Sequence, residues 1–479
     1  MNTYQIKEFK GGIADEKYKG VRGSFAFGYG LDIHTGNDTL KCNQKLKKDS
    51  GDVVTDLILF FVPSANGNLY GFGDSGKIYK KTGGGGAWEL VYTDTNGKIM
   101  GAGEYTNNDG GGTYRTYLYW ATETKLSRIK IDGDWETDVE HNWGNLTGDP
   151  AWHTMRIACG VLQIVDGNYI AMVDYEGNFN NKALDLIPGN RGKCLLETGE
   201  LTVIGSTRGD KVEEGWIWTW DKIQPSWLTK KRVAEKGVNA IITSEGIIMQ
   251  AGINGGLYFY DGVNLMRIKQ FPGGGWVNPG GVTNMRGLPL FGVIGTDKCG
   301  VYSYGRLNKN DVYALNLEFI PSHGKMENVK IGAMTMFEDD FYLSWKDGAT
   351  YGTDIIDWEN KAEAKYEGLV FDGGEPFIQK TYRHIKLLTK PLPKNCSIEV
   401  YYRVNEQGDW KKATMEDGAE RFDKEGNTKA IFTIETGDEE GEEKGKGESY
   451  EVGLDMHPNA NDTPEVIAIN TYFTPAEIF

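Results

Sequence analysis

Apolar and aromatic residues alternate along much of the chain in short runs that end at turns. In one such run, Leu257 and Phe259 alternate with Tyr258 and Tyr260. A period of two residues is typical of a β-strand. Apolar or aromatic side chains at both alternating sets of positions indicate a sheet that packs on both faces. The same hairpin recurs along the chain with a turn glycine, at Gly76, Gly167, Gly215, Gly256, Gly300 and Gly348.

The spacing of these hairpins predicts the architecture. The turn glycines are 91, 48, 41, 44 and 48 residues apart, and the first step is two periods because residues 117–129 form a further copy with a polar turn. Seven repeats of this size predict a seven-bladed β-propeller over residues 1–372. A strand within residues 25–40 is expected to complete the last blade, because closure removes exposed strand edges. We assign the blades to residues 55–97, 98–149, 150–191, 192–237, 238–274, 275–322 and 323–372.

A different pattern begins near Glu375. Alternating strands without the glycine-aromatic hairpin occupy residues 397–404, 430–434, 450–454 and 466–473. This pattern predicts a C-terminal β-sandwich over residues 375–479, to which we assign the role of an assembly domain. The acidic run 438–448 is expected to be a solvated hairpin loop.

Composition and charge narrow the class of protein. The chain has 479 residues, with 65 Gly, 25 Tyr, 19 Phe and 13 Trp, which favours the all-β class. Its net charge of −16 argues against direct sequence-specific nucleic-acid binding, which needs clustered cations. No apolar run approaches ~18 residues, so no membrane span is predicted. The five cysteines lack a C-x-x-C pair and are expected to be free thiols.

Residue types that serve metal sites and common enzymes do not occur at the required spacing. The six histidines are scattered and form no H-E-x-x-H motif, and no G-x-S-x-G or phosphate-binding glycine loop is present. We therefore predict no enzymatic activity, no cofactor and no metal. Residues 107–114 resemble the Ser-x-Asp-x-Gly-x-Thr-Trp turn of sialidase-like propellers, and we interpret this turn as structural.

Tryptophans are the main candidates for contacts with other molecules. Trp216, Trp218 and Trp220 alternate on one strand, as in a sugar-stacking platform or in packing between blades, and we favour packing. Five others lie at strand ends or in loops, where they suit contacts with a partner or a glycan: Trp88, Trp135, Trp152, Trp227 and Trp276. From these we take Trp88, Trp135 and Trp276 as interface candidates.

Segments at both ends of the chain carry a family resemblance. G-G-I at 11–13, G-Y-G-L-D-I at 28–33 and T-P-E-V-I at 463–467, together with the blade hairpins, resemble the β-propeller structural proteins of tailed bacteriophage virions, including nozzle and tail-tip components. The resemblance implies a non-enzymatic tail protein, made in the host cytoplasm and located in the virion. It also implies homo-oligomeric assembly and contacts with other virion tail proteins.

The alternative is a protein of another functional class: a sialidase-like propeller that binds or cleaves glycans at a host surface. A buried Tyr-Glu pair beside converging arginines would favour such an enzyme. Shallow polar propeller faces and large contacts between subunits would favour the structural protein.

Overall fold

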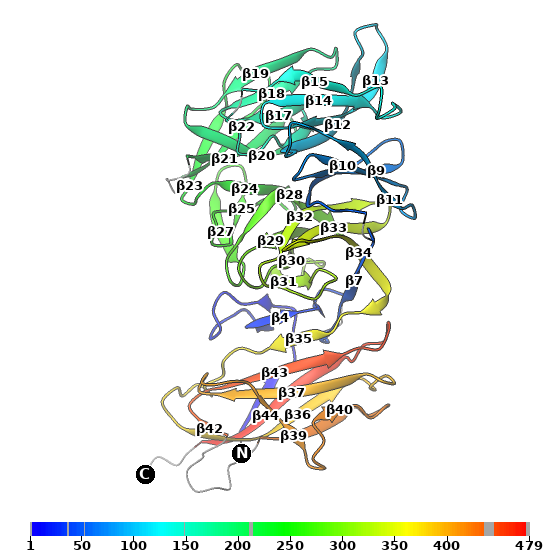
Figure 1. Cartoon of the computed structure of the whole chain (residues 1–479). Coiled ribbons are helices and arrows are strands. Elements are labelled where there is room, and N and C mark those ends of the chain that lie inside the picture. The colour runs from blue at the N-terminus through cyan, green and yellow to red at the C-terminus, as the bar shows by residue number, and fades with distance from the viewer. Residues whose placement is uncertain are drawn as a thin grey trace. The chain divides into compact units, whose positions relative to one another are not determined.

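The computed structural model describes residues 2–35, 38–51, 53–147, 149–209, 214–434 and 445–475. Over these ranges the regular elements are β-strands, and Figure 1 shows them in chain order from blue to red. The described chain contains no helix that is long and apolar enough to span a membrane. Most of the acidic run 438–448 lies outside the described residues.

The chain divides into two compact units. The propeller unit comprises Lys47–Gly300 and Pro321–Ile355, and the sandwich unit comprises Met1–Leu46, Val301–Ile320 and Ile356–Phe479. The chain therefore passes from one unit to the other four times, instead of once near residue 372 as the sequence pattern predicted.

Seven four-stranded sheets follow one another in chain order, and we number them as blades 1 to 7. Blade 1 has β8 (Ile58–Pro63), β9 (Asn68–Gly73), β10 (Lys77–Thr82) and β11 (Trp88–Thr93). Blade 2 has β12 (Gly101–Asn108), β13 (Tyr114–Ala121), β14 (Lys125–Lys130) and β15 (Glu140–Asn145). Blade 3 has β16 (Met155–Ala158), β17 (Val161–Asp166), β18 (Tyr169–Val173) and β19 (Phe179–Asp185).

The remaining blades have the same meander. Blade 4 has β20 (Asn190–Thr198), β21 (Leu201–Arg208), β22 (Gly215–Trp220) and β23 (Thr229–Val233). Blade 5 has β24 (Val238–Thr243), β25 (Ile247–Ala251), β26 (Gly256–Tyr260) and β27 (Leu265–Gln270). Blade 6 has β28 (Trp276–Met285), β29 (Leu288–Ile294), β30 (Gly300–Gly305) and β31 (Ala314–Phe319). Blade 7 has β32 (Lys330–Phe337), β33 (Asp340–Asp347), β34 (Thr350–Lys361) and β7 (Gln44–Lys48).

The first strands of the blades form a closed ring. Each contacts the first strand of the next blade, in the order β8, β12, β16, β20, β24, β28 and β32, and β32 in turn contacts β8. Glycine permits this close approach: a Cβ atom at Gly332 would lie 2.0 Å from the carbonyl oxygen of Ile58, and one at Gly101 would lie 1.7 Å from that of His153. The seven-bladed propeller is thus the fold of this part of the chain.

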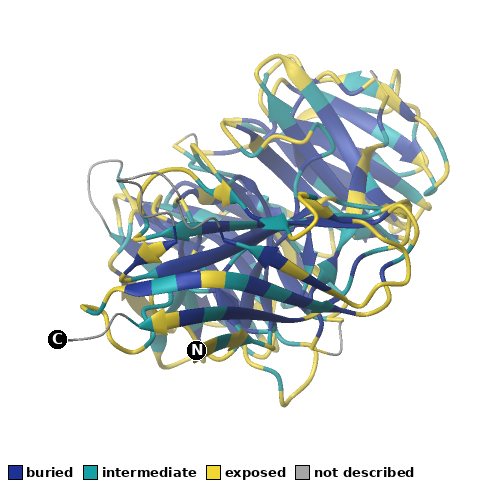
Figure 2. Cartoon of the chain, turned by 90° about the horizontal axis from the view of Figure 1, so that it is seen from below, coloured by how far each residue is buried: buried dark blue, intermediate teal, exposed yellow. Residues whose placement is uncertain are grey.

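Apolar layers between neighbouring blades make up the core of the propeller unit. Phe72 and Trp120 belong to the layer between blades 1 and 2. Tyr342 and Leu69 belong to the layer between blades 7 and 1. Strands are mainly buried and the connecting loops mainly exposed, as Figure 2 shows. Each blade therefore needs apolar side chains on both faces, which explains the two-phase alternation in the sequence.

The strand that completes blade 7 is not the expected one. We predicted it within residues 25–40, but β7 occupies this position, while β4 (Phe27–Tyr29) pairs with β35 (Ala364–Glu367). Phe25 and Phe27 are both buried, whereas β7 buries only Leu46. A mostly polar segment suits the outer strand of a blade, and the more apolar segment requires a covered position.

The sandwich unit contains two six-stranded sheets. The first has the order β1 (Asn2–Ile6), β44 (Val466–Pro475), β36 (Lys380–Thr389), β41 (Lys429–Thr433) and β39 (Thr414–Met415), with β42 (Lys446–Gly447) also paired to β36. The second has the order β38 (Lys411–Lys412), β37 (Ser397–Val404), β43 (Tyr450–His457), β35 and β4, with β40 (Arg421–Phe422) also paired to β37. Two short pairs also belong to the unit: β2 (Gly12–Ile13) with β3 (Ser24–Phe25), and β5 (Leu31–Asp32) with β6 (Lys41–Cys42). The unit further includes β31 and most of β30, which are strands of blade 6.

Aromatic rings join the two sheets of the sandwich. Tyr382 on β36 stacks on Tyr450 on β43 with ring centroids 4.7 Å apart, and Phe473 on β44 packs beside Tyr382. The predicted sandwich is therefore present, but residues 375–479 alone do not form it. Its sheets also take β1, β4 and β35, so the expected boundary between residues 372 and 375 is corrected.

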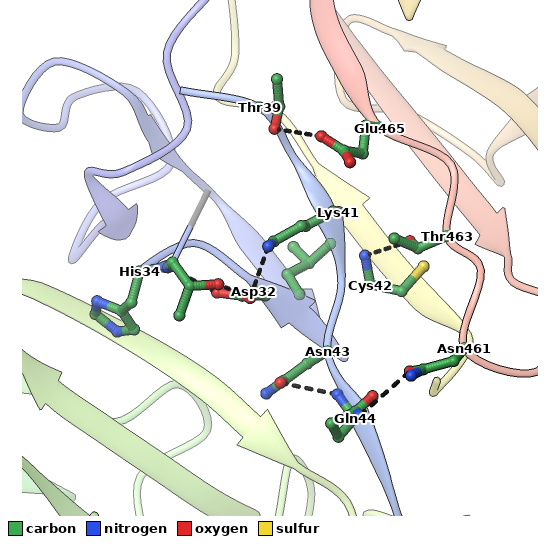
Figure 3. Close-up of polar contacts among 12 residues, drawn as sticks. Asp32, His34, Thr39, Lys41, Cys42, Asn43, Gln44, Asn461, Thr463 and Glu465 are labelled. Atoms are coloured by element: carbon green, nitrogen blue, oxygen red, sulfur yellow. Dashed lines mark hydrogen bonds and ion pairs between the residues drawn. The ribbon is translucent and has the colours of Figure 1, made fainter. Parts of the chain in front are cut away.

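Residues 32–44 are tied to residues 461–465 within the sandwich unit (Figure 3). The backbone N–H of Cys42 donates to Thr463 Oγ1 at 2.9 Å, and Thr39 Oγ1 donates to Glu465 Oε2 at 3.1 Å. The backbone amides of Leu40 and Val466 also exchange hydrogen bonds with each other's carbonyl groups at 2.9 Å. These contacts fix the N-terminal segment against the last strand of the chain.

One buried carboxylate organises a charged cluster on the second sandwich sheet. Glu399, whose side chain is 5% exposed, accepts hydrogen bonds from the Tyr401 hydroxyl at 2.6 Å and from Arg421, and lies 3.0 Å from Lys412 Nζ. Burial opposes ionisation of Glu399, but these hydrogen bonds outweigh it and lower the pKa of the carboxyl to about 2. The ordinary pKa is 4.5, so the stabilisation is complete above about pH 4.5 and is lost as the pH falls towards 2.

We expect Glu399→Gln to lower the free energy of unfolding by about 2 kcal/mol at pH 7, measured by urea denaturation. The difference from wild type should shrink as the pH is lowered from 5 to about 2. Glu420→Gln is the matched control: Glu420 lies 2.9 Å from the same Lys412 Nζ, but its side chain is 60% exposed, so the expected loss is below about 0.5 kcal/mol. A loss that does not change with pH would contradict the assignment to ionised Glu399.

Candidate binding site at the ring entrance

A hollow of about 320 Å³ lies in the propeller unit where several innermost strands begin. Trp276 is the first residue of β28, Arg191 and Lys193 lie near the start of β20, and Lys236 and Trp152 shortly precede β24 and β16. We call it the ring-entrance hollow, and its lining residues are Ala151, Trp152, Arg191, Lys193, Thr207, Gly209, Lys236, Asn239, Ile253 and Trp276. Its position follows from the fold, since these strands converge on the ring.

Two indole rings form part of the wall of the ring-entrance hollow. Trp276 is 41% exposed, which is high for a large aromatic side chain. Trp152 is half-buried, with its ring centroid 5.9 Å from that of Phe60 and with Lys98 Nζ 4.6 Å above the ring. Packing therefore holds Trp152 in place, whereas Trp276 offers an open ring face.

Cationic side chains supply the charge of the hollow. Arg191 contacts Asp149 at 2.8 Å, and Lys193 Nζ donates to Asn239 Oδ1 at 2.8 Å. Asn239 is itself fixed, because its amide donates to Gln250 Oε1 at 2.9 Å. Lys236 is exposed and has no hydrogen bond or ion pair with any other described residue. Three cations therefore line the described wall, but Arg191 is paired with the Asp149 carboxylate and Lys193 with Asn239, so Lys236 is the cation best placed to meet an anion.

The structure places the three interface candidates differently. Trp276 lies in the ring-entrance hollow. Trp135 is half-buried and packs against Tyr70 and Trp120, with ring centroids 5.8 and 6.0 Å away. Trp88 is 4% exposed, so our prediction of an interface role for it is wrong.

Trp88 is a core residue of the propeller unit. Its Nε1 donates to Asp49 Oδ2 at 2.8 Å, and Lys81 Nζ lies 2.9 Å from the same oxygen. Its ring packs near Phe61 and Tyr342. The sequence placed Trp88 correctly at a strand end but gave no sign that neighbouring strands cover it.

Other interpretations from the sequence are confirmed. Trp218 and Trp220 are buried in the layer between blades 3 and 4, so their alternation serves packing. In the turn at 107–114, the carboxylate of Asp109 forms local hydrogen bonds: its Oδ1 accepts the N–H of Gly111 at 2.9 Å, and its Oδ2 accepts a hydrogen bond from Arg115 Nε at 3.0 Å. The five cysteines are free thiols, at Cys42, Cys159, Cys194, Cys299 and Cys396.

Sequence reasoning singled out Trp152 and Trp276 but missed the cations of the hollow. Arg191 and Lys193 lie on β20 and Lys236 precedes β24, one blade further along the chain, and the three follow no motif. Their common feature is a position beside the first residues of an innermost strand, which becomes visible only once the blades are aligned. Over the described residues, no group of three His, Cys, Asp or Glu side chains is placed to hold a metal ion.

A second surface stands out on the outer part of blades 4 and 5. The turns after β22 and β26 have the same form: Asp221 Oδ1 accepts the N–H of Ile223 at 2.9 Å, and Asp261 Oδ1 accepts that of Val263 at 2.8 Å. In each turn, the residue between the aspartate and the N–H donor has a positive φ, which is 64° at Lys222 and 98° at Gly262. These turns leave Ile223 83% and Val263 72% exposed.

A hollow of about 530 Å³ links the two blades beside these turns, lined in part by Leu228 and Gly262. Lys231 Nζ on β23 donates to the carbonyl oxygen of Val263 at 3.0 Å, which ties the two blades together. We call Ile223, Leu228 and Val263 the blade 4–5 surface. It is apolar, and its turn geometry is defined by hydrogen bonds.

No family model matches the chain, and no curated protein sequence matches it. Among solved structures, Raptor from Chaetomium thermophilum is similar at a TM-score of 0.47 and 12% identity, over 67% of this chain and 29% of that one. The extracellular domain of a hybrid two component system from B. thetaiotaomicron is similar at a TM-score of 0.46 and 13% identity, over 78% of this chain and 45% of that one. The WD40 β-propeller domain of Doa1 is similar at a TM-score of 0.43 and 12% identity, over 67% of this chain and 98% of that one. At these values the similarity has no bearing on function.

Proposed function

We propose that this protein is a non-enzymatic structural component of a bacteriophage tail that assembles in several copies and contacts neighbouring tail proteins. The blade 4–5 surface is the observation that carries the assembly part of the proposal. The tail assignment rests on the resemblance of residues 11–13, 28–33 and 463–467 to virion propeller proteins.

The energetics of the blade 4–5 surface support an interface. Ile223 and Val263 are largely exposed and add little to the core of their own chain. Burying one such side chain against a partner contributes about 1.5–3 kcal/mol, and the fixed turns reduce the entropy lost on binding. Single exposed apolar residues are common, but here two turns of the same construction on adjacent blades each expose one.

The sandwich offers a second place for contacts. Ile431 on β41 and Ile467 on β44 are 41% and 42% exposed, and both strands pair with β36 in the first sheet. This surface supports the role of assembly domain that we assigned to the C-terminal residues.

The assembly proposal predicts that Ile223→Ser together with Val263→Ser weakens self-association at least tenfold, because two apolar contacts are lost. The measurement is sedimentation of the purified full chain over a range of concentrations. Tyr175→Ser is the matched control, since Tyr175 is 58% exposed on a turn of blade 3. Equal association of wild type and the double variant would contradict a role for this surface.

The tail assignment has its own test. An antibody against the purified protein should label the tails of particles of the phage that encodes it, as seen by electron microscopy. If the protein is present in infected cells but the antibody does not label the particles, a virion role is contradicted.

A further inference from the structure

The charge of the ring-entrance hollow differs from that of the whole chain. The net charge is −16, yet Arg191, Lys193 and Lys236 line the hollow, and the Asp149 carboxylate beside them is paired with Arg191. The negative field of the whole chain repels anions at long range. An anion held at the hollow must therefore be bound by short-range contacts, for which exposed Lys236 is placed.

The indole of Trp276 adds a second kind of recognition. An exposed indole face binds flat, weakly polar surfaces such as the C–H face of a pyranose ring or a nucleobase. Nearby polar groups, the Thr207 hydroxyl and the Asn239 side chain, belong to the same wall. The volume of about 320 Å³ is at the lower end of the ~300–1,000 Å³ of ligand sites, which suits one or two sugar units.

We propose that the ring-entrance hollow binds an acidic saccharide, with a sugar ring against Trp276 and its carboxylate beside Lys236. Arg191, paired with Asp149, and Lys193, bonded to Asn239, lie on the same wall. A saccharide uses all three features of the site, since its ring stacks, its carboxylate pairs with a cation and its hydroxyl groups form hydrogen bonds. A nucleic acid also stacks on indoles, but it needs several phosphate contacts along a positive track, and the strongly acidic chain disfavours it.

The test uses the full-length protein and tetragalacturonic acid as the acidic probe, with the galactose tetramer as its neutral counterpart. We expect the acidic tetramer to bind about tenfold more tightly than the neutral one, measured by calorimetry and tryptophan fluorescence. Its affinity should fall as salt is added. A thymidine tetranucleotide serves as the nucleic-acid probe.

Two matched pairs of variants test the residues. Trp276→Ala is expected to weaken binding of the acidic tetramer about tenfold, while Trp358→Ala, at a tryptophan 43% exposed, should leave it unchanged. Lys236→Ala should remove most of the preference for the acidic tetramer, and Lys394→Ala, at another exposed lysine, should not. The unfolding midpoints of all four variants should equal that of wild type.

Three results would overturn the proposal: equal binding of acidic and neutral tetramers, tighter binding of the tetranucleotide, or no binding of any probe. An equal loss in Trp276→Ala and Trp358→Ala would do the same. This inference is independent of the tail proposal, because Ile223→Ser and Val263→Ser should leave saccharide binding intact.

Discussion

Deletion of residues 375–479 is expected to unfold what remains of the two sandwich sheets. The deletion removes β44 and β43, which are the partners of β1 and β35. Tyr366 on β35 is 1% exposed in wild type and packs against Phe9 and Phe25, so this cluster loses its cover. Hydrogen exchange followed by mass spectrometry should show β1, β4 and β35 exchanging at the rate of unfolded chain.

A shorter deletion, of residues 476–479, is the control for this experiment, because it removes none of the described strands. It should leave the exchange of β1, β4 and β35 unchanged. Protected amides in β4 and β35 after the long deletion would show that these strands fold without the C-terminal residues. The long deletion therefore cannot test assembly alone, and point substitutions at Ile431 and Ile467 are the better probe.

Trp88→Ala is expected to destabilise the protein by about 3–5 kcal/mol, because it empties a large volume in a packed layer. The change also removes the N–H donor to Asp49 while Lys81 remains paired with that carboxylate. Urea denaturation followed by far-ultraviolet circular dichroism measures the loss. Trp88→Phe keeps most of the packing and should cost less, about 1–2 kcal/mol.

Trp276→Ala is the matched control, since the exposed indole contributes little to the core. We expect a change within about 0.5 kcal/mol. Unchanged stability in Trp88→Ala, combined with lost self-association, would restore the interface role that the sequence suggested for Trp88.

The sequence determined the propeller because its information is local and repeated. Each hairpin carries its own alternation and turn, so the spacing of Gly167, Gly215 and Gly256 is enough to locate the blades. The buried face shared by Trp218 and Trp220 follows from their separation of two residues. The sandwich was visible for the same reason, as alternation in residues 397–404 and 466–473.

The tertiary structure alone decided which distant segments pair and which loop side chains are covered. Residues 25–40 and β7 both suit a strand, and only the burial of Phe25 and Phe27 against the sandwich assigns each to its sheet. Trp88 and Trp276 occupy similar positions along their strands, yet neighbouring strands cover one and leave the other open. The cations of the ring-entrance hollow come together because innermost strands converge on the ring. Such contacts join residues far apart in the chain, and a local pattern does not encode them.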